Sequence, residues 1–175
     1  MIQLHDKTFE PYLSEKDIQG IIQKMSVQMS HLENDNPLFI IILKGSFLFA
    51  SDLLKALPFD AELTFMQIKS YHGTQSSGNI QDVMGLPLNL SGRTLVIIED
   101  IIDTGNTLEY LYNRLKQEKP KHIYIASLLL KPSVFSKNIT IDFVGQEIPN
   151  NFVVGYGLDY NELGRTLPQI YKLKI

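Results

Sequence analysis

Apolar residues near the start of the chain follow two different patterns, which predict a helix and then a strand. Between residues 18 and 32 they recur at helical spacing, directly after the sequence SEKD at 14–17, which is suited to capping a helix. The run LFIIIL at 38–43 is apolar without interruption and rich in β-branched residues. Such a run is typical of a strand covered on both faces, so we expect it in the middle of a sheet.

The pattern continues as two consecutive units, each of which joins two strands through one helix. This alternation predicts an α/β fold in which helices flank a parallel sheet. Between the units, the polar and glycine-containing segment 71–79 has neither period, which favours an exposed flexible loop or an ordinary hairpin turn. The expected elements are a strand at 38–43, a helix at 47–57, a strand at 62–69, a strand at 94–100, a helix from about 106 to 119 and a strand at 122–130.

Length and composition are those of one globular domain, which we expect to span residues 1–175. The net charge of -3 and the absence of a basic stripe make nucleic acid an unexpected partner. No uncharged apolar run approaches the roughly 18 residues of a membrane helix, and the first residues lack a targeting pattern. We therefore expect a cytoplasmic protein without a membrane anchor. The chain has no cysteine, which excludes disulfides, zinc–thiolate sites and thiol nucleophiles.

The second unit contains a polar loop whose residue types suit a phosphorylated sugar. In the sequence VIIEDIIDTGNT at 96–107, Gly105 allows a tight backbone turn, and the hydroxyls of Thr104 and Thr107 stand beside the expected start of a helix. Unpaired N–H groups and the positive end of a helix dipole bind phosphate at such a place. The adjacent acids Glu99 and Asp100 add oxygen atoms that suit sugar hydroxyls or Mg²⁺.

The common phosphate-binding motifs are missing from the sequence. There is no G-x-x-x-x-G-K-[ST], and the Gly155-Tyr156-Gly157 turn lacks the third glycine of a dinucleotide-binding motif. Phosphate, sugar and magnesium together suggest a phosphorylated ribose.

The stretch at 96–107 resembles the signature of the phosphoribosyltransferases, which bind phosphoribosyl pyrophosphate (PRPP) through two acids and a D-[TS]-G-x-T loop. Further motifs follow in the same order and spacing from Ile40 to Leu167, and together they resemble the hypoxanthine (guanine) group of the purine phosphoribosyltransferase family. These motifs are LKG at 43–45, SY at 70–71 with SSG at 76–78, Lys131, and FVVGYGLDYN at 152–161 followed by Arg165.

The resemblance implies a type I phosphoribosyltransferase fold with a flexible lid at about 70–82, which includes Ser70 and Tyr71. It also implies a base-binding segment at 131–175 and a small base-binding hood built from the terminal segments. The implied activity is purine salvage, in which the 5-phosphoribosyl group passes from PRPP to hypoxanthine and guanine, giving IMP or GMP and pyrophosphate. The implied cofactor is Mg²⁺, and the implied assembly is a homodimer or homotetramer.

By residue, the resemblance makes Asp103 the general base at the purine N7. It assigns the purine to Lys131 at the 6-oxo oxygen, to Phe152 by stacking, and to the carbonyl of Val153 at a 2-amino group. The other implied roles are the 5′-phosphate for Thr104, Gly105, Asn106 and Thr107; the ribose hydroxyls, directly or through Mg²⁺, for Glu99 and Asp100; a second Mg²⁺ for Asp159; and the pyrophosphate for Leu43, Lys44, Gly45 and Arg165. In family members the peptide matching Leu43-Lys44 is often cis.

One departure from the family concerns the residues after Lys131. Many relatives carry basic residues there, whereas this chain has Val134 and Phe135, which puts pyrophosphate contacts from this loop in doubt.

Several assignments have ordinary structural alternatives. Lys44 and Arg165 also suit a solvated surface, and Phe152 also suits a core strand. The four histidines show no spacing typical of a metal site, so they receive no role.

Two other functions compete at the level of the whole chain: an RNA-binding regulator on the same fold, and a transferase that prefers xanthine or guanine. A receiver domain also places acids at strand ends, but it would not explain the threonine-containing loop.

Overall fold

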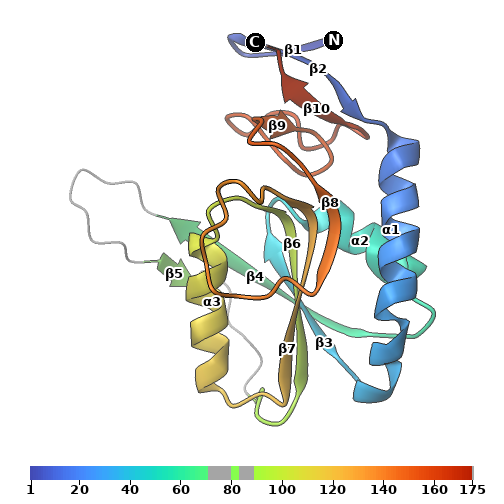
Figure 1. Cartoon of the computed structure of the whole chain (residues 1–175), viewed down its shortest axis with the longest axis vertical. Helices are drawn as coiled ribbons and strands as arrows, with labels where there is room; N and C mark the ends of the chain where they lie inside the picture. Colours follow the sequence, from blue (N-terminus) through green and yellow to red (C-terminus); the bar gives the residue numbers. More distant parts are fainter. Residues whose placement is uncertain (71–79, 83–88, 175) are drawn as a thin grey trace.

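The computed structural model describes residues 1–70, 80–82 and 89–174. Its centre is a six-stranded sheet in which five neighbouring strands are parallel and β5 pairs antiparallel at one edge (Figure 1). Along the sheet the strands are β5 (Ile80–Asp82), β4 (Glu62–Ser70), β3 (Leu38–Leu43), β6 (Thr94–Ile102), β7 (His122–Leu130) and β8 (Phe143–Glu147). The predicted parallel α/β sheet is therefore confirmed.

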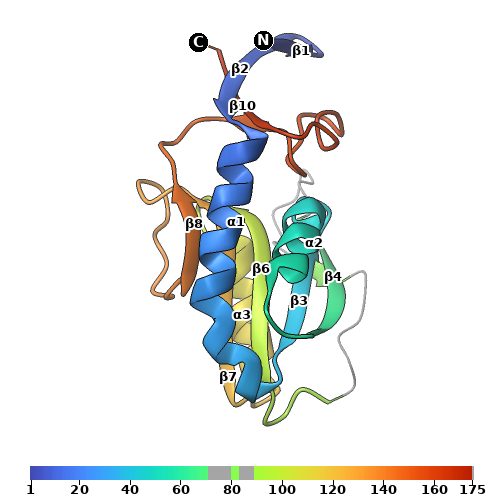
Figure 2. The same ribbon diagram turned by 90° about the vertical axis from the view of Figure 1, so that its right-hand side faces the viewer.

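Helices cover both faces of this sheet (Figure 2). Helices α1 (Glu15–Met29) and α2 (Phe47–Ala56) lie on one face, and α3 (Asn106–Gln117) lies on the other. The 3₁₀ turn η1 (Ser30–Asp35) continues α1 toward β3. The cap predicted for α1 is present, because the Ser14 side chain accepts from the Asp17 N–H at 3.2 Å and the Asp17 carboxylate accepts from the Ser14 N–H at 2.9 Å.

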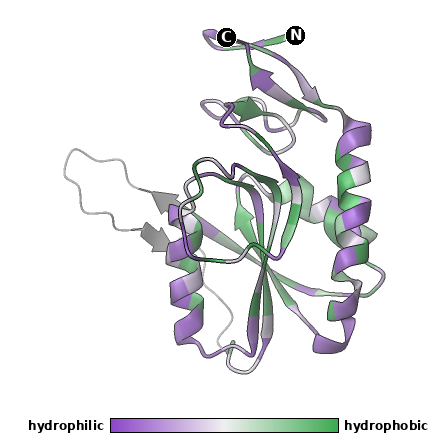
Figure 3. Ribbon diagram, in the orientation of Figure 1, coloured by the Kyte–Doolittle hydropathy of each residue, from purple (hydrophilic) through white to green (hydrophobic). Residues whose placement is uncertain are grey.

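The continuous apolar run of β3 follows from its place between the two helical layers. Phe39 and Ile41 belong to the apolar cluster under α1 and α2, whereas Leu38, Ile40 and Ile42 belong to the cluster under α3. Because successive side chains of a strand point to opposite faces, both sets must be apolar. The hydropathy colouring shows apolar strands in the centre and helices that are hydrophilic on their outer faces (Figure 3).

The two termini of the chain form a second, smaller sheet at one end of the molecule (Figure 1). Its strands pair antiparallel, so residues far apart in sequence become neighbours, as with Leu173 and Phe9. In order, they are β1 (Ile2–Leu4), β2 (Lys7–Leu13), β10 (Ile170–Leu173) and β9 (Val153–Val154). This terminal sheet lies beyond the carboxyl ends of β3, β6 and β7, where the loops into α2 and α3 also lie.

Most elements agree with the sequence-based expectations to within two residues, including β3 and β7, which match them fully. Strand β6 runs two residues further than expected, through Ile102. The terminal strands, β5 and β8 were not predicted as elements. No helix among the described residues is long and apolar enough to span a membrane.

Candidate active site

A cavity of about 260 Å³ opens where the parallel strands end, as expected for ligand sites in open α/β sheets. It is formed by the ends of β3 and β6 and by the loop between β6 and α3. Its described lining consists of Ile42, Leu43, Gly45, Ile68, Glu99, Asp100, Ile101, Ile102, Asp103, Thr104, Gly105, Asn106, Thr107 and Leu108. Nine of the predicted site residues thus share one cavity, although they come from two separate motifs.

The loop after β6 has the backbone conformation expected of an anion-binding turn. Gly105 precedes α3 and has a φ of 83°, a left-handed conformation that glycine adopts without penalty. Its carbonyl accepts the N–H of Glu109 at 2.9 Å, which closes the first turn of the helix. The N–H groups of residues 106–108 have no carbonyl of their own helix to bond, so they are available to an anion at the cavity.

Glu99 and Asp100 bring two carboxyl groups into the protein interior at the end of β6. Glu99 is 8% exposed, and burial, followed by the neighbouring charge of Asp100, raises its pKa well above the ordinary value. Burial also raises the pKa of Asp100, although the Ile101 N–H, at 2.9 Å, and the charge of Arg165 oppose this rise. Two adjacent carboxyl groups, of which Glu99 is buried and Asp100 partly buried, have the donor chemistry of a Mg²⁺ site.

Gly45 is packed so closely against this acidic pair that no side chain would fit. A Cβ at Gly45 would overlap the carboxylate of Asp100. The peptide bond between Leu43 and Lys44 is cis, which settles a point that the sequence left open. The turn predicted to meet pyrophosphate therefore lies directly beside Glu99 and Asp100.

Asp103 and Lys131 form an ion pair at the cavity, with Nζ 3.0 Å from Oδ2. The lysine side chain is 7% exposed, whereas the aspartate is half-exposed. A second acceptor, Oδ1 of Asn150, lies 3.3 Å from the same ammonium. The backbone fixes this arrangement, because the Lys131 N–H donates to the carbonyl of Ile102 at 3.0 Å. The residues predicted to act on N7 and on the 6-oxo group of a purine are thus neighbours.

Arg165 and Lys44 both form ion pairs with acidic residues of the C-terminal segment, Arg165 with a largely buried side chain and Lys44 with an exposed one. Arg165 Nη2 lies 2.7 Å from Asp159 Oδ1, and Nη1 donates to the carbonyl of Gly157 at 2.9 Å. Its buried Nε has no hydrogen-bond partner among the described residues. Lys44 Nζ lies 3.1 Å from Oε2 of Glu162. Glu162 also lies 3.4 Å from Arg165 Nη2, so contacts within the C-terminal segment link the two basic residues and Asp159.

Phe152 and Val153 lie at the free edge of the terminal sheet. The Phe152 ring is 43% exposed and lies 5.8 Å, centroid to centroid, from the ring of Tyr160. The Phe152 carbonyl accepts the N–H of Leu173 at 2.8 Å. Because carbonyls alternate between the two edges of a strand, the carbonyl of Val153 points away from β10 and is available to a ligand.

The structure places the predicted metal ligands at two separate points. Glu99 and Asp100 are adjacent, whereas Asp159 is paired with Arg165; among the residues described, no group of three acidic or histidine side chains is placed to hold a metal. The predicted lid falls largely outside the described residues, including Tyr71. Ser70 ends β4, and its backbone pairs with that of Ile80.

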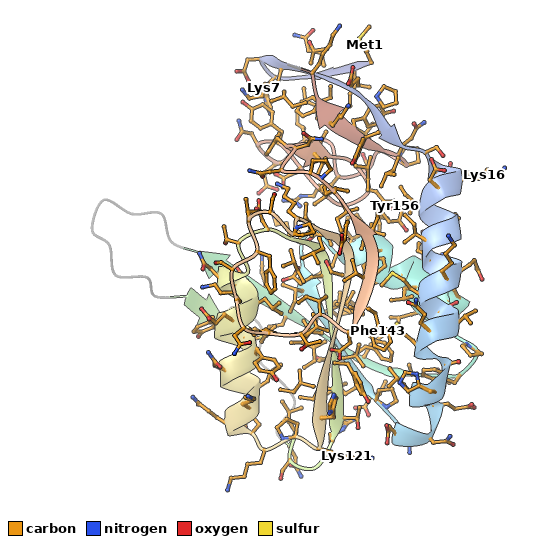
Figure 4. The ribbon with its side chains drawn as sticks, viewed as in Figure 1. Met1, Lys7, Lys16, Lys121, Phe143 and Tyr156 are labelled. Atoms are coloured by element: carbon orange, nitrogen blue, oxygen red, sulfur yellow. The ribbon has the colours of Figure 1, made fainter. Side chains whose placement is uncertain are left out.

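Three residues next to the site were not predicted from the sequence. Asn150 bonds to Lys131, as described above. A Cβ at Gly157 would overlap the carbonyl oxygen of Gly45, so the C-terminal segment touches the pyrophosphate turn. Tyr156 is buried between the terminal sheet and the helices, and its hydroxyl donates to Asp52 at 2.6 Å (Figure 4). The last two belong to the motif FVVGYGLDYN at 152–161, which resembles a base-binding segment, but neither residue had been given a role of its own.

Comparisons with known proteins agree with this geometry. Residues 10–161 match the phosphoribosyl transferase domain family. Hypoxanthine-guanine phosphoribosyltransferases from Staphylococcus aureus Mu50 and Staphylococcus epidermidis are 40% and 41% identical, each over 98% of this chain and 97% of the relative. A crystal structure of a hypoxanthine phosphoribosyltransferase from S. aureus has a TM-score of 0.89 at 40% identity, and covers 97% of this chain and 94% of its own.

A second solved structure, a hypoxanthine-guanine phosphoribosyltransferase from Bacillus anthracis, has a TM-score of 0.86 at 32% identity, over 97% of this chain and 100% of its own. These relatives do not support the alternative of an RNA-binding regulator. The chain therefore belongs to the phosphoribosyltransferase family, in its hypoxanthine-guanine phosphoribosyltransferase group.

Proposed function

We propose that this protein transfers the 5-phosphoribosyl group of PRPP to N9 of hypoxanthine or guanine, giving IMP or GMP and pyrophosphate. The observation that carries the proposal is the arrangement of the cavity. A phosphate-binding turn, a buried acidic pair and the Asp103–Lys131 pair lie at the same edge of the sheet. This order matches the phosphate, ribose and base of a nucleotide.

The 5′-phosphate would bind in the turn formed by Thr104–Thr107. The backbone N–H groups at the start of α3 and the hydroxyls of Thr104 and Thr107 are its donors. A negative group at this end of α3 is also favoured by the helix dipole. Because these groups are fixed by the fold, the phosphate orients the ribose toward Glu99 and Asp100.

The acidic pair would hold the ribose hydroxyls, directly or through Mg²⁺. Members of this family generally use Mg²⁺ with PRPP, and the two adjacent carboxyl groups are oxygen donors of the kind that this ion prefers. When bound, Mg²⁺ supplies positive charge that favours departure of the pyrophosphate. Asp159 is the candidate contact for a second ion, once its pairing with Arg165 is released.

The leaving pyrophosphate would meet the turn at Leu43–Gly45 and the side chain of Arg165. Gly45 allows the pyrophosphate to approach the backbone closely, because no side chain stands in the way. Arg165 has donors to offer, including the Nε that has no partner among the described residues. Donors that are fixed before the bond breaks stabilise the charge that develops on the leaving group.

The purine would stack on Phe152, with its 2-amino group at the carbonyl of Val153. Lys131 donates to the 6-oxo oxygen, and Asp103 accepts the proton from N7 as N9 attacks the ribose. Because Lys131 is a donor only, it satisfies a 6-oxo group but not a 6-amino group. Hypoxanthine and guanine therefore fit the site, whereas adenine does not.

We also propose that the protein works in the cytoplasm as a homodimer or homotetramer. A related hypoxanthine phosphoribosyltransferase from Trypanosoma cruzi, 29% identical with a TM-score of 0.87, was studied for the role of its C-terminal region in oligomeric state and activity.

The proposed reaction is tested by incubating the protein with PRPP, Mg²⁺ and one base at a time: hypoxanthine, guanine, xanthine or adenine. Chromatography of the products should show IMP and GMP, with no comparable product from adenine. Comparable turnover of adenine and hypoxanthine would contradict the role given to Lys131. A product only from xanthine would favour the competing base preference.

A further inference from the structure

The segment after Lys131 carries Phe135 where many relatives carry basic residues, and the side chain of Phe135 packs into the protein. Phe135 is partly buried and packs against the apolar cluster beneath α3. Its N–H donates to the carbonyl of Lys131 at 3.1 Å, which folds the segment back toward the site. A phenyl ring has no charge with which to bind pyrophosphate. Any effect of Phe135 on the site must therefore come from its packing.

The ring of Phe135 lies directly against Gly105 of the phosphate turn. A Cβ at Gly105 would lie 2.6 Å and 2.9 Å from two ring carbons of Phe135, and 2.8 Å from Cγ of Lys137. The two side chains therefore fill the space that glycine leaves free. In its described lining the cavity includes Gly105 but neither Phe135 nor Lys137. They support the turn from the side that faces away from the cavity.

Lys137 is also tied to the first turn of α3. Its Nζ lies 2.8 Å from Oε2 of Glu109, whose N–H donates to the carbonyl of Gly105 at 2.9 Å. Gly105, Glu109 and Lys137 thus form a closed ring of contacts at the start of the helix. The Lys137 side chain is 19% exposed and that of Glu109 is 43% exposed, so water screens this ion pair only in part.

Glu109 places a negative charge near the proposed phosphate site. A lone carboxylate there would repel a phosphate that carries close to two negative charges. Lys137 neutralises this carboxylate without entering the cavity.

We propose that Phe135 and Lys137 are positioning residues for the 5′-phosphate turn. Phe135 holds the backbone of Gly105 in place, and Lys137 cancels the charge of Glu109. We call these three side chains, Phe135, Lys137 and Glu109, the clasp. The inference rests on the proposed function, because it takes Thr104–Thr107 as the phosphate site. The clasp begins from the same segment as Lys131, so it also joins the phosphate turn to the residue that binds the base.

Steady-state kinetics with PRPP as the varied substrate separate packing from charge. Replacing Phe135→Ala removes the ring, and KM for PRPP is expected to rise between about tenfold and a hundredfold, with a smaller change in kcat. Phe135→Leu, which restores apolar volume, should recover most of this loss.

Lys137→Met keeps the apolar stem and removes the charge, so KM for PRPP should rise about two- to fivefold. Adding Glu109→Gln to Lys137→Met should reverse that rise, because no unpaired carboxylate remains.

Competition binding of IMP and inosine tests whether the effect is confined to the phosphate. IMP carries the 5′-phosphate and inosine does not, so Phe135→Ala and Lys137→Met should lose affinity for IMP and keep their affinity for inosine. An equal loss for both ligands would show a general structural role and would overturn the inference, as would an unchanged KM in all variants. If the wild-type protein itself binds no PRPP and forms no IMP, the proposed function fails instead.

Discussion

The contact between Gly157 and Gly45 gives the sharpest prediction about how the site is assembled. A Cβ at position 157 would lie 3.0 Å from the carbonyl carbon of Gly45 and closer still to its oxygen. Gly157 also has a φ of 100°, which disfavours alanine by about 1–2 kcal/mol before any clash is counted. Both contacting groups are backbone, so they cannot rotate away. Gly157→Ala should therefore displace the pyrophosphate turn by about 1 Å, and a displacement of that size lowers kcat/KM by about 10²-fold.

Gly92→Ala is the matched control for this variant. Gly92 has a φ of 73°, and the structure describes no atom within 4 Å of a Cβ built there; it precedes β6 at the opposite end of the sheet. The Gly92→Ala variant should lose about 1–2 kcal/mol of unfolding free energy in urea denaturation, through backbone strain alone, and should keep the wild-type kcat/KM for PRPP. The reasoning is refuted if Gly157→Ala and Gly92→Ala have similar kcat/KM values.

Three further predictions concern Glu99, Tyr156 and Lys131. The raised pKa of Glu99 favours the folded state below its ordinary value of 4.5, and this advantage is lost as pH rises through the folded-state pKa. The Glu99→Gln variant should therefore exceed the wild type in free energy of unfolding by more at pH 8 than at pH 4, and it should bind Mg²⁺–PRPP more weakly. A stability difference that does not change with pH in urea titrations would contradict this. Tyr156→Phe removes a 2.6 Å hydrogen bond to Asp52 and should lose about 1.5–3 kcal/mol in urea denaturation at neutral pH, whereas a loss near zero would show that the bond contributes nothing. The preference for hypoxanthine over adenine in kcat/KM should be about 10⁴-fold or more and should fall markedly in Lys131→Met; an unchanged ratio would remove Lys131 from base selection.

The parts of the fold that could be predicted are those whose signals lie within short stretches of sequence. The uninterrupted apolar run of β3 and the capping sequence before α1 each specify their element locally. Strands β1, β2 and β10 could not be predicted in this way, because they are short and depend on pairing between the two ends of the chain, such as Leu173 with Phe9.

The same division holds within the candidate site. The residues Glu99 to Thr107 form one continuous motif, and the structure places them around one cavity, as the sequence indicated. The partners of that motif come from other parts of the chain. Asn150 beside Lys131 and Phe135 behind Gly105 are contacts of the folded chain, so no pattern of spacing could reveal them.

The most direct test of the account is a single-turnover measurement of IMP formation with Asp103→Asn beside the wild type. Enzyme in excess over PRPP, with Mg²⁺ and hypoxanthine, should form IMP and pyrophosphate in equal amounts. The variant keeps the size of the side chain but loses the basic carboxylate, so it should bind both substrates and form IMP about 10²- to 10⁴-fold more slowly. A wild type that forms no IMP, or a variant that reacts at the full rate across pH, would contradict the account.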